Sequence, residues 1–301
     1  MFSTPDILVG FVLPPLVCAA ILTLAWRPWR RGERAVDARW ANAVAIGVAY
    51  AIGYVRLVGD LVFPPANPDT WILYLMPVVM AVGIVFCLIG RAPILRLGCV
   101  IVICAVLSFL LVRPLIGQPM SRQAAILWTA GGTIVMSLWW LIFNTLAMRG
   151  PRMLAPMAGL VVAAGAAAVL GDGGLALRGG FPLAVLALAI AAACAVAFFT
   201  PRFKLAGGGT LAVTFVIVGT ILYAYHYIYP EPGPRMVSAL DILLTAPLLA
   251  LVILLPGLRN RGDWLKTTIA IVLVILAVAA AVLVSDVGRH PPQDQSEVAT
   301  L

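Results

Sequence analysis

Apolar residues fall into ten long runs along the chain, with short polar segments between them. A bilayer hydrocarbon core of about 30 Å is crossed by about 20 apolar residues of helix, and nearly all the runs are that long. The pattern therefore predicts an all-α fold, a polytopic integral membrane bundle of about ten transmembrane helices. The predicted spans are 7–26, 41–58, 70–89, 94–112, 124–148, 153–170, 181–199, 210–229, 237–255 and 264–285.

Basic residues gather in alternate gaps between these spans. Short loops rich in Lys and Arg stay in the cytoplasm, and the gaps after the odd-numbered spans hold 14 of the 20 basic residues. The other gaps and the termini hold six arginines, including Arg178, and nine of the twelve acids, including Asp69. We therefore expect a multi-pass protein of the cell (inner) membrane, with both termini on the noncytoplasmic side.

Composition excludes a soluble fold and several classes of site. Hydrophobic residues make up 63% of the chain and charged residues 11%, with a mean hydropathy of +1.07. The net charge of +8 is scattered through loops without an aromatic-interleaved patch, so the lipid bilayer is the expected partner and nucleic acid is not. With two histidines and no CxxC motif, the chain offers no metal-ligand set, and we predict no metal or cofactor.

The chain reads as one transmembrane bundle over residues 1–285, followed by a polar, disordered tail over 286–301. The turn around Arg149 and Arg152 separates five spans from five, giving halves 1–148 and 153–285. Halves with an odd number of spans insert in opposite orientations, which is the arrangement of a 5+5 inverted repeat. In length and span number the chain is similar to the drug/metabolite transporter superfamily, a resemblance that implies transport. It carries no motif of that family, and the family's cytoplasmic termini are opposite to the orientation predicted here.

A polar stripe follows the fifth span. At 100° per residue, Thr129, Thr133, Ser137 and Asn144 fall within one arc of roughly 80°. One interpretation is that these side chains bind a substrate along a cavity or permeation path. The other is that they form hydrogen bonds to neighbouring helices, a common use of Ser, Thr and Asn in membranes.

The end of the eighth span carries the densest candidate chemistry. Tyr223, His226 and Tyr227 share one helical face, and Asp241 lies about as far beyond the following turn as His226 lies before it. A shielded His226–Asp241 pair could bind substrate by passing a proton or holding a cationic group. Alternatively, these rings form an interfacial aromatic belt, and Asp241 complements the dipole of its own helix.

Two arginines near the noncytoplasmic ends of spans suggest an anion-binding rim. Arg56 ends the second span, with Asp60 four residues later, and Arg113 ends the fourth. The alternative is that both side chains snorkel to headgroup phosphates.

Three functional classes remain open. A transporter or permease is favoured by ten spans, the five-plus-five division and the polar stripe. Its solute would be neutral, amphipathic or lipid-like, because no ionisable residue falls near the middle of a span. The alternatives are a membrane-embedded transferase near the outer leaflet, with His226 as base, and a noncatalytic subunit of a larger complex. GxxxxGK[ST], HExxH and Gly-x-Ser-x-Gly are absent from the sequence, so no catalytic residue is assigned.

Overall fold

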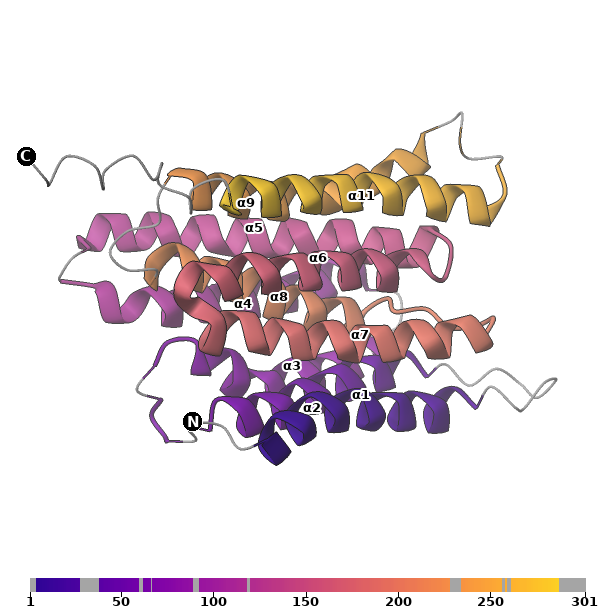
Figure 1. The fold of residues 1–301 in the computed structure, drawn as a ribbon, viewed down its shortest axis with the longest axis horizontal. Helices are drawn as coiled ribbons and strands as arrows, with labels where there is room; N and C mark the ends of the chain where they lie inside the picture. The colour runs from indigo at the N-terminus through magenta and orange to yellow at the C-terminus, as the bar shows by residue number, and fades with distance from the viewer. Residues whose placement is uncertain are drawn as a thin grey trace, which may run out of the picture.

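The computed structural model describes residues 4–27, 38–59, 62–65, 67–88, 92–117, 120–227, 234–255, 258 and 261–286. Over these residues the chain forms an elongated bundle of helices (Figure 1). In chain order they are α1 (Thr4–Trp26), α2 (Arg39–Leu57), α3 (Thr70–Leu88), α4 (Pro93–Val112), η1 (Arg113–Leu115), α5 (Arg122–Arg149), α6 (Leu154–Leu170), η2 (Gly171–Gly180), α7 (Phe181–Phe199), α8 (Gly208–Tyr227), α9 (Pro234–Leu249), η3 (Ala250–Leu254) and α11 (Asp263–Asp286).

The all-helical fold is as predicted, and within the described ranges nine helices are long and apolar enough to cross a membrane. The one remaining predicted span, the sixth in chain order, is α6, which has 17 residues and falls below that length. It continues through the wide helical turn η2 into α7, which packs alongside it (Figure 1). Each predicted boundary lies within three residues of the observed one when η3 is counted with α9. The predicted tail, apart from Asp286 at the end of α11, lies outside the described residues.

Successive helices run in opposite directions, so the bundle has two chemically different ends (Figure 1). We call one the basic end, because Arg39, Arg96, Arg149, Lys204 and Lys266 lie at the helix termini or connections there. The other is the tyrosine end. It contains the η2 turn and the last turns of α2 and α8, and α1 begins and α11 ends there.

Helix α8 is the centre of the bundle. Of its 20 residues, 17 are buried, and it packs against α2, α3, α4, α5, α6, α7 and α9. In contrast, most residues of α1, α4 and α11 are at least partly exposed, as expected for helices that face lipid. A side chain near the end of α8 is therefore surrounded by other helices.

The two five-helix halves do not pack in the same way. In the second half α11 runs along α6, whereas the corresponding helices of the first half, α5 and α1, make no substantial contact among the described residues. Helix α8 packs on α5, while its counterpart α3 makes no such contact with α11. The inverted repeat remains a prediction about origin, and the packing itself is asymmetric.

Two glycines allow α8 to approach α3 closely at the basic end. A Cβ atom added to Gly208 would lie 2.5 Å from the Cα of Gly83 and 2.8 Å from the Cβ of Ala43. Backbone atoms and a methyl group cannot rotate away, so only glycine fits at this crossing.

Candidate functional site

The most unusual polar residue of the described structure is Asp69, which immediately precedes α3 at the tyrosine end. Its side chain is only 1% exposed, although it lies beside the first turn of a membrane-spanning helix. A carboxylate at this position complements the partial positive charge of the helix N-terminus. Burial of a carboxyl group is nevertheless costly unless its oxygens are bonded.

Among the described residues, one of the two carboxylate oxygens of Asp69 has a side-chain partner. The Tyr54 hydroxyl lies 2.8 Å from Oδ2 and 3.2 Å from the Thr70 Oγ1, so it joins the two side chains. The other oxygen, Oδ1, is buried and has no hydrogen-bond partner among the described residues, although the backbone N–H groups of Asp69 and Thr70 also act on the carboxyl group. An unbonded carboxylate oxygen in a buried position is a place where a ligand or a water would be stabilised.

Arg178 and Tyr223 complete a group that we call the Asp69 cluster, consisting of Tyr54, Asp69, Thr70, Arg178 and Tyr223. The guanidinium of Arg178, from the η2 turn, interacts electrostatically with Asp69 and lies within hydrogen-bonding reach of the Tyr223 phenol. Tyr223 in turn stacks on Tyr227, with ring centroids 4.9 Å apart. Side chains from α2, α3, η2 and α8 thus converge on one carboxylate.

Burial raises the pKa of Asp69 above its usual value, while the Tyr54 hydrogen bond and the charge of Arg178 act in the opposite direction. Desolvation is the largest of these effects, so the neutral acid is favoured more than at an exposed carboxyl group. The cluster can therefore hold a proton, accept a hydrogen bond at Oδ1 and donate hydrogen bonds from Arg178.

Sequence reasoning missed this cluster. Asp69 and Arg178 were read only as loop charges, and Tyr54 was not considered. Asp69 before Thr70 and an apolar run is a helix-start signal. Tyr54 precedes Asp69 by 15 residues on another helix, and Arg178 and Tyr223 follow it by more than a hundred. Of the predicted site residues, Tyr223 alone belongs to the cluster, and Tyr227 reaches its edge.

The structure gives His226 and Asp241, which the sequence predicts to be neighbours, different partners. The His226 ring instead meets Trp128 of α5 edge to face, with centroids 4.7 Å apart. Asp241 is exposed and accepts a hydrogen bond from the hydroxyl of Tyr225. The reason is the rotation of about 100° per helical residue, which turns Tyr225 toward α9 and its neighbour His226 toward α5. This geometry favours the aromatic-belt interpretation of His226.

The polar side chains of the α5 stripe contact different neighbours. Thr133 donates to the carbonyl of Thr129 in its own helix at 2.7 Å, and the Ser137 hydroxyl lies beside Cys104 of α4. Asn144 Oδ1 accepts from the backbone N–H of Gly207 at 2.8 Å and from the Thr210 hydroxyl at 3.3 Å. These contacts favour helix packing over a shared path along the stripe.

Arg56 and Arg113 are both exposed at the tyrosine end. Their helices, α2 and α4, make no substantial contact with each other among the described residues, so the structure does not bring the two guanidiniums into one rim. Asp60 lies outside the described residues. The exposure of both arginines favours the snorkelling interpretation.

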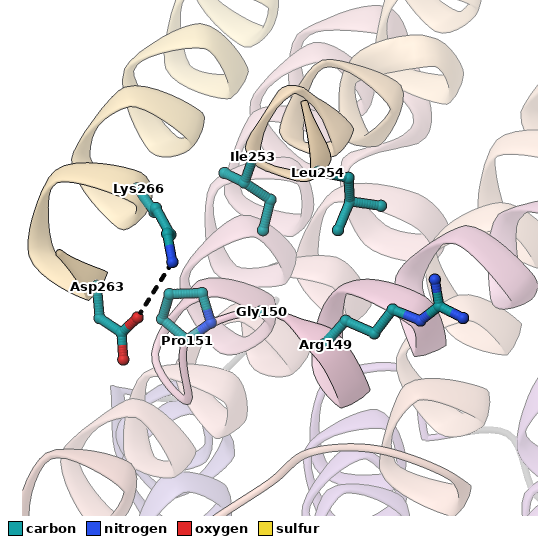
Figure 2. Close-up of a pocket in the computed structure, with 7 residues that line it drawn as sticks. All are labelled: Arg149, Gly150, Pro151, Ile253, Leu254, Asp263 and Lys266. Atoms are coloured by element: carbon teal, nitrogen blue, oxygen red, sulfur yellow. Dashed lines mark ion pairs between the residues drawn. The ribbon is translucent and has the colours of Figure 1, made fainter. Parts of the chain in front are cut away.

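A hollow of about 570 Å³ lies at the basic end, between the α5–α6 turn, η3 and α11. Figure 2 shows the ion pair between Lys266 and Asp263 on one wall, 3.7 Å apart, with the Arg149 side chain pointing away from it. Asp263 is largely exposed, and surface pairs of this kind contribute little to stability. This hollow has no unbonded buried donor or acceptor among its lining residues, unlike the Asp69 cluster.

Comparison of the chain with models of known protein families gave no match, and comparison with curated protein sequences gave none either. The functional argument therefore depends on the geometry of the chain itself.

Proposed function

We propose that this protein is a transporter or permease of the cell membrane for a small, net-neutral and amphipathic solute, and that the Asp69 cluster binds the polar part of that solute. The observation that supports the proposal is the buried, unbonded Oδ1 of Asp69, with the Arg178 guanidinium nearby. Buried ionisable groups in membrane bundles usually serve substrate or proton pathways.

The ionised form of Asp69, which is populated above its raised pKa, gives the cluster a balance of charge that suits a net-neutral solute. When Asp69 is ionised, its charge and that of Arg178 offset each other, so a net-neutral ligand leaves neither charge uncompensated. Such a ligand would need a donor for Asp69 Oδ1 and an acceptor for Arg178. The stacked rings of Tyr223 and Tyr227 provide an adjacent apolar surface for the rest of the solute.

The distribution of basic residues extends the proposal to orientation. The basic end would face the cytoplasm and the tyrosine end the outside, because short cytoplasmic loops are rich in Arg and Lys. The Asp69 cluster would then receive solute from the noncytoplasmic side.

Native purification followed by mass spectrometry of bound small molecules tests this function. We expect a solute retained by the wild-type protein to be at least tenfold depleted in the Asp69→Asn variant, which keeps the size of the side chain but removes its charge. A tenfold loss corresponds to about 1.4 kcal/mol of binding free energy. The captured solute should also exchange across proteoliposomes that contain the wild-type protein.

The matched control is Asp263→Asn, which removes an exposed acid at the basic end. This variant should keep the bound solute and the exchange. Identical bound molecules in all three proteins, or a tightly bound partner protein with no solute, would contradict the proposal and favour the subunit class.

A further inference from the structure

A second cavity lies at the basic end, far from the Asp69 cluster along the bundle. It has a volume of about 560 Å³ and lies where the start of α4 meets the end of α5, beside the start of α2. Its lining includes three polar residues, Arg39, Arg96 and Asn144. Arg39, Arg96 and Asn144 also line a smaller inner hollow that reaches Gly208, the first residue of α8.

The electrostatic field of this cavity is positive. Two guanidiniums contribute full charges, and the first residues of α2 and α4 line the wall. The residues that cap these helices are Ala38 and Ala92, whose side chains cannot accept hydrogen bonds from the N–H groups of the first turn. Those N–H groups and the helix dipoles add to the positive field. None of the described residues that line the cavity is acidic.

The polar side chains of the lining carry hydrogen-bond donors, and one of them, Arg96, already donates through Nη2 to the Phe86 carbonyl at 2.7 Å. Arginine has N–H groups and no acceptor. Trp140 lines the cavity, is 4% exposed, and its Nε1 is buried without an acceptor in the part of the chain that the structure describes. The oxygen of Asn144 already accepts hydrogen bonds from Gly207 and Thr210. The amide nitrogen of Asn144, which is a donor, is therefore the group that remains for a ligand. A site with donors alone requires a ligand with several acceptor oxygens.

The remainder of the wall is apolar and opens toward the region where lipid would lie. Ile94 is 86% exposed, and Leu97 and Leu141 are exposed as well. These side chains belong to the outer faces of α4 and α5, which continue toward the middle of the bundle as exposed apolar surface at residues such as Ile101 and Leu138. A ligand that fits both parts has an anionic head and a hydrocarbon tail.

We infer that this cavity binds one anionic phospholipid, with its phosphate held by Arg39, Arg96 and the Trp140 N–H, and an acyl chain lying along α4 and α5. Guanidiniums form strong charge-assisted hydrogen bonds with phosphate oxygens. The inference is independent of the function proposed above, because it uses none of the residues of the Asp69 cluster.

Native mass spectrometry of the full chain, titrated with phosphatidylglycerol or phosphatidylcholine, tests the site. We expect the wild-type protein to retain one phosphatidylglycerol preferentially. The paired variant Arg39→Gln/Arg96→Gln should lose at least tenfold in affinity for this lipid, with little change for phosphatidylcholine. The matched control is Arg113→Gln/Arg122→Gln, which removes two exposed arginines at the opposite end and should bind like the wild type.

Trp140→Phe provides a second test that keeps an aromatic side chain and both charges. It should lower phosphatidylglycerol affinity several-fold because the Nε1 donor is removed together with the five-membered part of the indole, and it can be read if the paired variant does not fold. Unchanged affinity in Trp140→Phe and in a folded paired variant would overturn the inference. Displacement of the lipid by an equal concentration of inorganic phosphate would also overturn it, because the site would then belong to a soluble anion.

Discussion

Two fully buried polar side chains, Asn42 at the basic end and Asp69 at the tyrosine end, are bonded to different extents. At the basic end, Asn42 accepts a hydrogen bond from the Trp26 indole at 3.0 Å and donates to the carbonyl of Lys204 at 2.7 Å. The oxygen of the half-buried Asn144 accepts two hydrogen bonds, from the N–H of Gly207 and the hydroxyl of Thr210 at the start of α8. At the tyrosine end, Asp69 is equally buried but has one bonded oxygen and one unbonded oxygen.

The difference separates polar groups that hold helices together from a polar group that is available for chemistry. An asparagine side chain that is hydrogen-bonded between helices holds those helices together, because lipid cannot supply such hydrogen bonds. A buried carboxylate with an unbonded oxygen destabilises the empty protein, and a ligand that bonds to it recovers that free energy. Substitution of a bonded asparagine between helices should therefore change mainly stability, whereas substitution of Asp69 should change mainly ligand binding.

The largest expected effect on stability is at the α3–α8 crossing of the basic end. Gly208→Ala places a methyl group against the backbone of Gly83, which should lower the free energy of unfolding by about 3 kcal/mol, because neither partner can move aside. Thermal unfolding in detergent measures this loss. The control is Gly98→Ala on α4, where an added Cβ meets no atom within 4 Å. Equal stability of the two variants would contradict the close crossing.

The next effect is at the tyrosine end. Tyr54→Phe removes the hydroxyl that bonds Asp69 and Thr70, and should cost about 2 kcal/mol because a buried carboxyl group loses its donor. The pKa of Asp69 should rise further, since this hydrogen bond opposes the effect of burial. Unfolding measurements across pH compare the variant with Tyr74→Phe, a nearby phenol in α3 outside the cluster. If both variants lose the same stability, Tyr54 does not support Asp69.

A smaller effect should distinguish the two interpretations of the α5 stripe. Asn144→Ala breaks the bonds to Gly207 and Thr210, with an expected loss of about 1 kcal/mol. Thr133→Val serves as the control, because its hydroxyl bonds only within its own helix. Unfolding free energies of both variants should show a loss for Asn144→Ala alone. Loss of solute binding in Thr133→Val with unchanged stability would instead support a substrate path along the stripe.

The smallest expected effect is at the α8–α9 contact. A double-mutant cycle between Tyr225→Phe and Asp241→Asn should give a coupling of about 0.5 kcal/mol, as for a partly exposed polar pair. The parallel cycle between His226→Gln and Asp241→Asn should give a coupling close to zero. A larger coupling for His226 than for Tyr225 would restore the pair expected from the sequence.

Helix positions were predictable from the sequence because a membrane span depends on local composition. The run of apolar residues in α7 alone fixes both of its boundaries, which agree with the prediction at Phe181 and Phe199. The length of α6 was harder to judge, because the glycine-rich segment after Leu170 continues as helical backbone in η2 rather than as a simple loop.

Side-chain partners were not predictable in the same way, because they depend on how helices rotate and which ones meet. His226 and Asp241 lie at similar distances from the turn between α8 and α9, which suggested that they pair. In the structure the residue that faces Asp241 of α9 is Tyr225, one position before His226. The partners of Asp69 come from α2 and from the η2 turn. Nothing in the spacing of these residues along the chain indicates that they meet.

The central claim, that Asp69 is a buried carboxyl group whose neutral form the fold favours, is tested most directly by labelling with a membrane-permeant carbodiimide, which reacts with protonated carboxyl groups. Burial raises the pKa of Asp69, so the folded state favours its neutral form; this contribution to stability is present at low pH and lost as pH rises through the raised pKa. Peptide mass spectrometry should therefore find Asp69 modified at pH values above the ordinary carboxyl pKa of about 3.9, with labelling that declines as pH rises further. The exposed Asp263 of the same molecule is the internal control and should remain unlabelled under those conditions. Labelling of Asp263 and Asp69 to the same extent at every pH would contradict the claim.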